Sequence, residues 1–213
     1  MRAARVEAAA VPRLYAIADR EALGARSLPG AVAAMAAAGV RWIQMRAKGA
    51  AGGDLFDLAA ACCEALVGSG AALWLDDRAD VAALLPVGGL HLGQHDLPPA
   101  AARPLLAPGV LVGRSTHDLS QLAAAAADPA VDVIALGPIF ATASKRQPDP
   151  VVGLAVLQAA RRLTRKPLVA IGGIDEDNLA AVLAAGADSA AVLSAACRGD
   201  VAASCRQLVA LAG

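Results

Sequence analysis

Residues 168–193 read LVAIGGIDEDNLAAVLAAGADSAAVL, and this stretch contains one full repeat of the fold. A short apolar run, Leu168 to Ile171, has the length and β-branched content of a buried strand, and a helical stretch, Glu176 to Ala185, follows it. Gly186 follows this stretch, and a glycine there can adopt the left-handed backbone conformation in which helices commonly end. A second apolar run begins at Ser189. Strand, helix and strand in this order are typical of a parallel sheet covered by helices.

The same alternation extends along the whole chain and gives eight strand–helix pairs. The expected strands are Leu14–Ala18, Val40–Met45, Ala72–Leu75, Gly89–Leu92, Val110–Gly113, Val133–Gly137, Leu168–Ile171 and Ser189–Leu193. The expected helices are Leu28–Ala38, Asp54–Val67, Arg78–Leu85, Ala100–Leu106, Leu119–Ala127, Leu154–Leu163, Glu176–Ala185 and Val201–Leu211. Gly39 ends its helix as Gly186 does. Eight such units predict a single-domain α/β fold, a (β/α)8 TIM barrel, with an open doubly wound sheet as the alternative.

The composition narrows the class of protein. The chain has 213 residues, 57% hydrophobic and 2% aromatic, with 19 Lys+Arg against 19 Asp+Glu. This apolar content argues against disorder, and no apolar run reaches the roughly 18 residues that a membrane span requires. Zero net charge without a basic run argues against nucleic acid as a partner. Because aromatic residues are scarce and roughly a quarter of the chain is Ala, we expect an aliphatic core.

The cysteines and the N-terminal segment indicate the cellular compartment in which we expect the protein. Cys62, Cys63, Cys197 and Cys205 show no metal-binding or redox spacing, so we expect free thiols in a reducing cytoplasm. Residues 1–12 lack the apolar centre of a secretory signal and are expected to be a frayed lead-in. No linker divides residues 1–213, which predicts one domain.

Candidate functional residues are those at the carboxyl ends of the strands, where barrel enzymes build their sites. The second strand leads into Gln44-Met45-Arg46-Ala47-Lys48, whose polar members fall at every second position. On an extended backbone they share one face and form a donor-rich patch suited to phosphate oxygens. The alternative is a strand end whose Arg46 and Lys48 side chains extend into solvent.

Carboxylates follow the third and fourth strands, in Leu75-Asp76-Asp77-Arg78 and Gly93-Gln94-His95-Asp96. Neighbouring strands end at the same rim, so Asp77 and Asp96 are candidate Mg²⁺ ligands. The alternative for Asp77 is a carboxylate that caps the helix expected from Arg78.

The fifth and sixth strands lead into Gly113-Arg114-Ser115-Thr116-His117 and into residues 137–145, which end Ala141-Thr142-Ala143-Ser144-Lys145. The second segment supplies two hydroxyls and an ammonium, and the Pro-rich stretch after it reads as a mobile loop over the site. His117 is either a general base or a capping or core histidine, and we favour the structural interpretation.

The seventh strand ends in Gly172-Gly173, and Leu193-Ser194 follows the eighth. In barrels these two loops commonly bind phosphate, although a tight turn also explains the glycines. The rim thus offers two anion-binding regions, a candidate Mg²⁺ pair and no nucleophile with a base. This set suits displacement of a phosphorylated leaving group.

Taken in order, these motifs resemble the thiamine-phosphate synthase family from about Leu14 to the C-terminus. The motifs that carry the resemblance are Tyr15, Gln44-x-Arg46-x-Lys48, Asp76-Asp77-Arg78-Ala79-Asp80, His91-Leu92-Gly93-Gln94-His95-Asp96-Leu97-Pro98, Gly113-x-Ser115-x-His117, Gly137-Pro138-Ile139-Phe140-x-Thr142-x-Ser144-Lys145 and Ile171-Gly172-Gly173-Ile174. The resemblance implies a cytoplasmic transferase of thiamine biosynthesis that joins hydroxymethylpyrimidine diphosphate to thiazole phosphate and releases pyrophosphate. By analogy it also implies a symmetric homodimer.

The resemblance assigns roles residue by residue. It implies that the pyrimidine diphosphate is held by the segment Gln44, Met45, Arg46, Ala47 and Lys48 together with Asp76, Ser115 and Lys145. It implies catalytic roles for Arg46, Lys48, Ser115 and Lys145. Asp77 and Asp96 would hold the Mg²⁺ cofactor. The thiazole phosphate would be received by Thr142, Ala143, Ser144, Gly173, Leu193 and Ser194.

At three positions the sequence differs from the family pattern, and these differences affect which of the family's residue roles apply to this chain. Asp76 stands where the family usually has Asn, and Ser144 replaces a usual Thr. Arg114 precedes Ser115 as it does in the related thiazole tautomerases, which use a histidine at the position of His117. Those relatives tend to lose the metal-site aspartates, which this chain keeps. The alternatives are therefore a thiazole tautomerase-like barrel and a non-catalytic protein that binds thiamine or thiazole phosphate.

Overall fold

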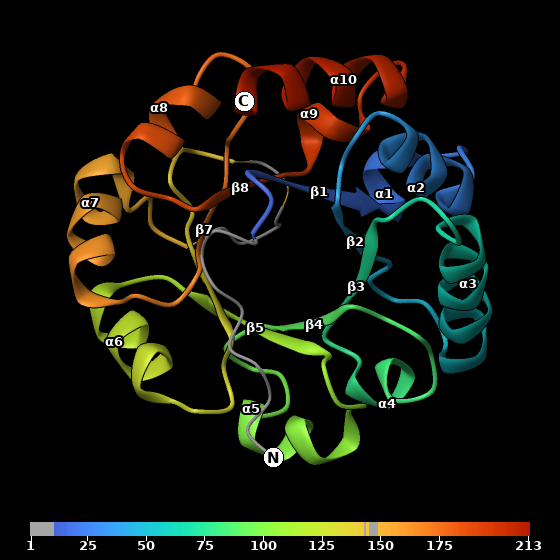
Figure 1. The fold of residues 1–213 in the computed structure, drawn as a ribbon, viewed down its shortest axis with the longest axis horizontal. Coiled ribbons are helices and arrows are strands. Elements are labelled where there is room, and N and C mark those ends of the chain that lie inside the picture. Colours follow the sequence, from blue (N-terminus) through green and yellow to red (C-terminus); the bar gives the residue numbers. More distant parts are fainter. Residues whose placement is uncertain (1–10, 143, 145–148) are drawn as a thin grey trace.

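Eight parallel strands form one closed barrel. The computed structural model describes residues 11–142, 144 and 149–213, so residues 1–10 of the expected lead-in and residues 147–148 of the Pro-rich stretch lie outside the described residues. Each strand pairs with the next in chain order, and β8 pairs with β1. Figure 1 shows the helices arranged around the ring of strands. The predicted (β/α)8 barrel is confirmed, and the open sheet is wrong.

All eight predicted strands are present. They are β1 (Leu14–Asp19), β2 (Trp42–Arg46), β3 (Ala72–Asp76), β4 (Gly89–Leu92), β5 (Leu111–Thr116), β6 (Val133–Leu136), β7 (Leu168–Ile171) and β8 (Ser189–Val192). Four of them, β1, β2, β3 and β5, end later than predicted. Strand β2 includes Arg46, which pairs with Asp19 of β1, and β5 runs on to Thr116, which pairs with Leu136 of β6. Ser115 therefore lies on a strand and not in a loop.

The helices also follow the predicted order. They are α1 (Arg20–Leu23), α2 (Leu28–Ala37), α3 (Gly52–Ala65), α4 (Ala79–Ala82), α5 (Pro99–Ala102), the 3-10 helix η2 (Arg103–Leu105), α6 (Leu119–Ala127), α7 (Gly153–Leu163), α8 (Leu179–Ala184), α9 (Ser194–Cys197) and α10 (Val201–Ala212). The short helices α1 and α9 were not predicted. Helix α8 begins at Leu179, so Glu176 belongs to the loop before it. In this loop the Asn178 side-chain oxygen accepts a hydrogen bond from Asp175 N, and the Asn178 amide nitrogen donates one to Gly173 O.

The glycine helix ends are confirmed. Gly39 has φ +101°, and Val40 N donates to Met35 O at 3.1 Å, the long bond of a Schellman cap. Gly186 has φ +109° after α8. These caps turn each helix back toward the next strand.

The core has two layers. Outward-facing strand residues pack against the helices in a layer of aliphatic, Met and Cys side chains, as predicted. The barrel interior differs, because Tyr15, Trp42 and Trp74 pack there with ring centroids 4.7–5.7 Å apart. The prediction of a wholly aliphatic core is therefore wrong. A small number of aromatic residues is enough to form this inner layer, since one barrel interior holds only a small number of side chains.

Two glycines make room for Trp74. A Cβ on Gly89 would lie 2.3 Å from the indole ring, and a Cβ on Gly113 would lie 3.3 Å from it. On the β4 and β5 side of the barrel interior, the Trp74 indole thus packs against glycine backbone.

The remaining composition-based expectations concern membranes and cysteines. Within the described part of the chain, no helix is both long and apolar enough to cross a membrane. The four cysteines are free; Cys63 is half-buried and the others are buried, as expected.

Candidate active site

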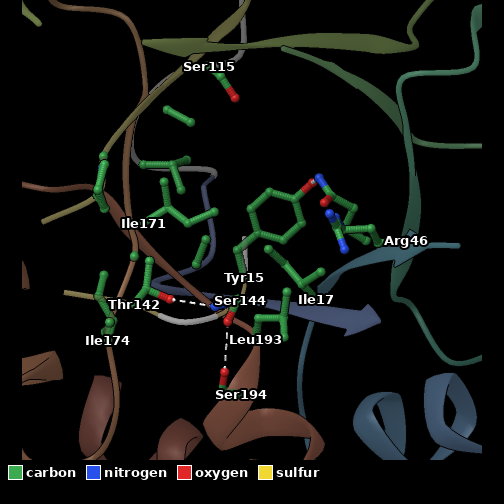
Figure 2. A pocket seen from close by; sticks show the side chains of 18 of the residues that line it. Tyr15, Ile17, Arg46, Ser115, Thr142, Ser144, Ile171, Ile174, Leu193 and Ser194 are labelled. Carbon is green, nitrogen blue, oxygen red and sulfur yellow. Dashed lines mark hydrogen bonds between the residues drawn. The ribbon is translucent and has the colours of Figure 1, made fainter. Parts of the chain in front are cut away.

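A cavity of about 500 Å³ opens at the carboxyl ends of the strands. Residues on or directly after all eight strands line it, and Figure 2 shows Tyr15, Ile17, Arg46 and Ser115 around it. Side chains alternate along a strand, so Gln44 and Arg46 face the cavity while Met45 faces the helices. A cavity of this size suits a small organic molecule.

Cations and carboxylates alternate across the ends of β1, β2 and β3. The Arg46 guanidinium binds Asp19, its pairing partner on β1, and its Nε lies 3.5 Å from Asp76 Oδ2. Lys48 Nζ lies 3.4 Å from the same oxygen and contacts Asp77. Asp76 Oδ2 is buried and accepts no hydrogen bond from a described residue. The predicted donor-rich patch exists, and carboxylates hold it in place.

Asp77 has a backbone conformation uncommon for a residue other than glycine. Its φ is +64°, a left-handed value that Asp tolerates better than most residues. Its N–H donates to His91 O at 2.8 Å, and the N-cap of α4 is Arg78, with no side-chain cap. The helix-capping alternative for Asp77 is therefore wrong.

Asp77 and Asp96 contact each other through a side-chain hydrogen bond. Burial, the Asp76 charge and this hydrogen bond raise the pKa of Asp77 to about 6. Burial alone would raise the pKa of Asp96, but the hydrogen bonds from Asp77 and from Gly93 N outweigh it and lower that pKa. Two neighbouring carboxylates form a site where a cation would relieve their repulsion.

Lys48 responds to the same excess of carboxylates. Burial lowers the pKa of Lys48, but the Asp76 charge and the Asp77 contact outweigh burial and raise it.

In the described residues no cluster of three or more His, Cys, Asp or Glu side chains forms a metal site. The Asp77–Asp96 pair is thus a hard-oxygen donor set of the kind that holds Mg²⁺ with few protein ligands.

Hydrogen bonds fix the polar groups on the cavity floor. Gln44 Nε2 donates to the Tyr15 hydroxyl at 3.0 Å, and burial raises the pKa of Tyr15 well above its usual value. His91 Nε2 lies 2.8 Å from Ser115 Oγ. Gln44 and Ser115 are therefore held in position before any ligand binds.

The opposite side of the cavity carries hydroxyls. Thr142, Ser144 and Ser194 line it with Gly173 and Leu193, and Ser144 Oγ lies 2.9 Å from Ser194 Oγ (Figure 2). Gly173 has φ +64°, and a Cβ there would lie 2.5 Å from Ala141 O. The loop after β7 therefore needs a glycine at 173 for its own packing.

Several predicted residues lie elsewhere. Lys48 and Asp77 line a small adjoining hollow of about 120 Å³ that shares Asp76 with the main cavity. Met45 and Ala47 also line this hollow and pack against the helices, and Asp96 lines neither space. Ala143 and Lys145 lie outside the described residues.

Comparisons with known proteins agree with this geometry. The profile of the family described as thiamine monophosphate synthase matches residues 14–196. A thiamine-phosphate synthase of Koribacter versatilis is 46% identical over 189 residues, covering 86% of this chain and 88% of its own. Another, of Methanoculleus marisnigri, is 42% identical over 196 residues and covers 92% of each chain. The chain belongs to the thiamine monophosphate synthase family.

A solved structure supports this membership at the level of the fold. The thiamine phosphate pyrophosphorylase from Pyrococcus furiosus superposes with a TM-score of 0.84 at 30% identity, covering 94% of this chain and 95% of that one. The predicted resemblance to the thiamine monophosphate synthase family is confirmed.

Two residues motivated the comparison with tautomerases. His117 lines the cavity, with Nδ1 2.6 Å from Gly137 O and 3.5 Å from Asp149 Oδ2. Arg114 lies outside the main cavity and donates to Gly93 O at 2.7 Å, so it stabilises the loop that carries Asp96. In this member of the thiamine monophosphate synthase family, Arg114 has a structural contact of its own.

Sequence reasoning assigned no role to Asp19, His91 or Arg198, although all three lie at the site. The alternation of side chains along a strand could have indicated the first two. Asp19 follows Tyr15 and Ile17 at every second position, so it lies on the same inner face of the barrel, and His91 faces inward from β4. Arg198 follows the unpredicted helix α9, so no periodic pattern indicates it.

Proposed function

We propose that this chain condenses 4-amino-2-methyl-5-hydroxymethylpyrimidine diphosphate with thiazole phosphate to give thiamine phosphate and pyrophosphate. The observation that carries the proposal is the cluster of Arg46, Lys48, Asp76 and Asp77 beside a small-molecule cavity. Cations next to paired carboxylates suit a diphosphate that binds together with a divalent cation. Membership of the thiamine monophosphate synthase family points to the same reaction.

Arg46, Lys48, Ser115 and Gln44 would hold the pyrimidine diphosphate, with Lys145 as a further contact. Asp76 would lie next to the diphosphate, where its negative charge opposes binding. Support comes from charge and fixed orientation. The Arg46 guanidinium is held by carboxylates from both neighbouring strands. A guanidinium donates two parallel hydrogen bonds to phosphate oxygens, so a fixed one favours a single diphosphate pose. Met45 and Ala47 would contribute backbone only, because their side chains face the helices.

Asp77 and Asp96 would hold Mg²⁺. The raised pKa of Asp77, about 6, which burial and the neighbouring carboxylates cause, supports a site that favours added positive charge. Bound Mg²⁺ supplies charge that stabilises the departing pyrophosphate. Lys48, which contacts Asp77, would then be free to turn toward the diphosphate.

Thr142, Ser144, Gly173, Leu193 and Ser194 would receive the thiazole phosphate, together with Ala143. Three hydroxyls on the side of the cavity opposite Arg46 support this assignment (Figure 2). Hydroxyls donate to phosphate oxygens without adding charge. The two substrates would thus meet across one cavity.

In the proposed reaction the bond between the pyrimidine methylene carbon and the diphosphate oxygen breaks, and its electron pair leaves with pyrophosphate. Arg46, Lys48 and Ser115 would stabilise the charge on that group. The lone pair of the thiazole nitrogen then forms the new carbon–nitrogen bond. This nitrogen loses no proton, so the reaction requires no general base. That suits a site in which His91 is hydrogen-bonded to Ser115 and His117 to Gly137 O.

One assay tests the proposal. Purified protein is supplied with both substrates, with and without Mg²⁺, and pyrophosphate release is followed together with formation of thiamine phosphate. We expect turnover only with both substrates and the metal. Tight binding of thiamine phosphate without pyrophosphate release would support a binding protein instead. Isomerisation of thiazole phosphate alone, without metal and lost in His117→Ala, would support a tautomerase.

We also propose a cytoplasmic location and a symmetric homodimer. Four free thiols suit a reducing compartment and support the location. The dimer rests on analogy with the family. Light scattering at several protein concentrations tests it, and a mass of one chain throughout would contradict it.

A further inference from the structure

Arg198 lies at the rim of the cavity, on the side that carries the hydroxyls. It follows α9 and lines the cavity together with Ser194 and Gly173. Among the described residues that line this cavity, Arg46 and Arg198 are the only Lys or Arg side chains. Arg46 is bound by carboxylates of β1 and β3, so the two guanidiniums come from different parts of the barrel.

The hydroxyl side of the cavity is otherwise acidic. Asp149 and Asp175 also line the cavity, and Thr142, Ser144 and Ser194 carry no charge. A phosphate monoester has about −1.5 to −2 charges at neutral pH. Hydroxyls can satisfy its oxygens, but only a cation offsets its charge near two carboxylates.

We propose that Arg198 binds the phosphate of the thiazole substrate and sets the preference for the phosphorylated thiazole over its alcohol. The inference rests on the proposed function and assigns it a binding residue outside the family motifs. Arg198 acts on substrate affinity, because the thiazole phosphate stays intact during the reaction.

The surroundings of Arg198 leave its donors available. Among the described residues, the only hydrogen-bond partner of the Arg198 side chain is Glu176, which one of its terminal nitrogens contacts. A guanidinium has five N–H donors, so most remain for a phosphate. The Arg198 side chain is 57% exposed, and an exposed ion pair adds little stability, so the contact with Glu176 is easily shared or released.

Steady-state kinetics of Arg198→Ala and Arg198→Lys test the proposal. We expect Arg198→Ala to raise the KM for thiazole phosphate about 10- to 30-fold, the usual effect of losing a charged hydrogen bond. The kcat and the KM for the pyrimidine diphosphate should stay within about twofold, because Arg46 and Lys48 are untouched. Arg198→Lys should lie between wild type and Arg198→Ala. With thiazole alcohol as substrate, kcat/KM should not change.

Two control variants separate binding from structure. Glu176→Gln breaks the ion pair but keeps Arg198, so the KM for thiazole phosphate should not rise. Arg162→Ala removes an exposed arginine of α7 that lies outside the cavity and should leave all constants unchanged. A KM that stays at the wild-type value in Arg198→Ala, or rises equally in Glu176→Gln, overturns the inference. If the wild-type enzyme releases no pyrophosphate, the proposed function itself fails.

Discussion

The left-handed backbone of Asp77 decides which substitution reports on its carboxylate. Ala is strained at φ +64°, whereas Asn tolerates this region and keeps the size of the side chain. Asp77→Asn therefore removes one charge with little change of backbone. We expect kcat to fall at least about 100-fold at ordinary Mg²⁺, since one of the two proposed Mg²⁺ ligands loses its charge. Pyrophosphate release across a range of Mg²⁺ concentrations measures this.

The matched control for Asp77 is Asp80→Asn. Asp80 is exposed and pairs with Arg78, so its loss should leave turnover within about twofold. Near-normal turnover of Asp77→Asn, at an unchanged melting temperature, would sink the metal assignment.

Asp76 is the departure from the family pattern with the clearest structural consequence. Its buried Oδ2 lies 3.4–3.5 Å from the two cations proposed for the diphosphate, so it competes with that ligand. Asp76→Asn removes the competing charge and adds an amide donor, while Asp19 still holds Arg46. We expect the KM for the pyrimidine diphosphate to fall about 3- to 10-fold. A KM that rises in initial-rate measurements would show that Asp76 helps to bind the diphosphate or its metal.

At the scale of the elements, the inner face of β4 depends on a missing side chain. A Cβ on Gly89 would lie 2.3 Å from the Trp74 ring, so Gly89→Ala should lower the free energy of unfolding by about 1–3 kcal/mol through overpacking. Gly53→Ala in α3 is the control, because nothing lies within 4 Å of its Cβ, and Ala should stabilise the helix by about 0.5–1 kcal/mol. Urea unfolding compares the two variants. Equal effects would contradict this account of Trp74.

The elements also show how far local pattern predicts this structure. Strand β7, loop and α8 are readable because each apolar run is short and Gly186 marks the return. The later ends of β2 and β5 are not, because pairing with Asp19 and with Leu136 extends them, and pairing partners are distant in sequence. Local pattern does not predict the position of Arg198 either, because its place at the cavity depends on β8 ending beside β7.

At the scale of the whole molecule, zero net charge conceals a strongly ordered charge distribution. Arg46, Lys48 and their carboxylates gather at the ends of β1, β2 and β3, while hydroxyls and Arg198 occupy the opposite side of the cavity. In the proposed reaction the polar groups of the two substrates would therefore be bound from opposite sides of the cavity, while the aliphatic helix layer positions the strands. Closure of the barrel joins the two sides, since β8 pairs with β1.

Closure also buries thiols in helices from both ends of the chain. Burial raises the pKa of Cys62 in α3 and of Cys205 in α10 to about 12, against an ordinary value of 9.0. The unfolded chain therefore loses these protons first, so the contribution of the two thiols to the free energy of unfolding should be constant well below pH 9 and fall as the pH rises toward 12. Each thiol accounts for about 1 kcal/mol of this loss at pH 10. Urea unfolding of the wild type and of Cys62→Ala/Cys205→Ala at pH 7 and pH 10 measures it. Referring each protein to its own value at pH 7 removes the packing cost of the substitutions, and an equal pH dependence in both would contradict the assignment.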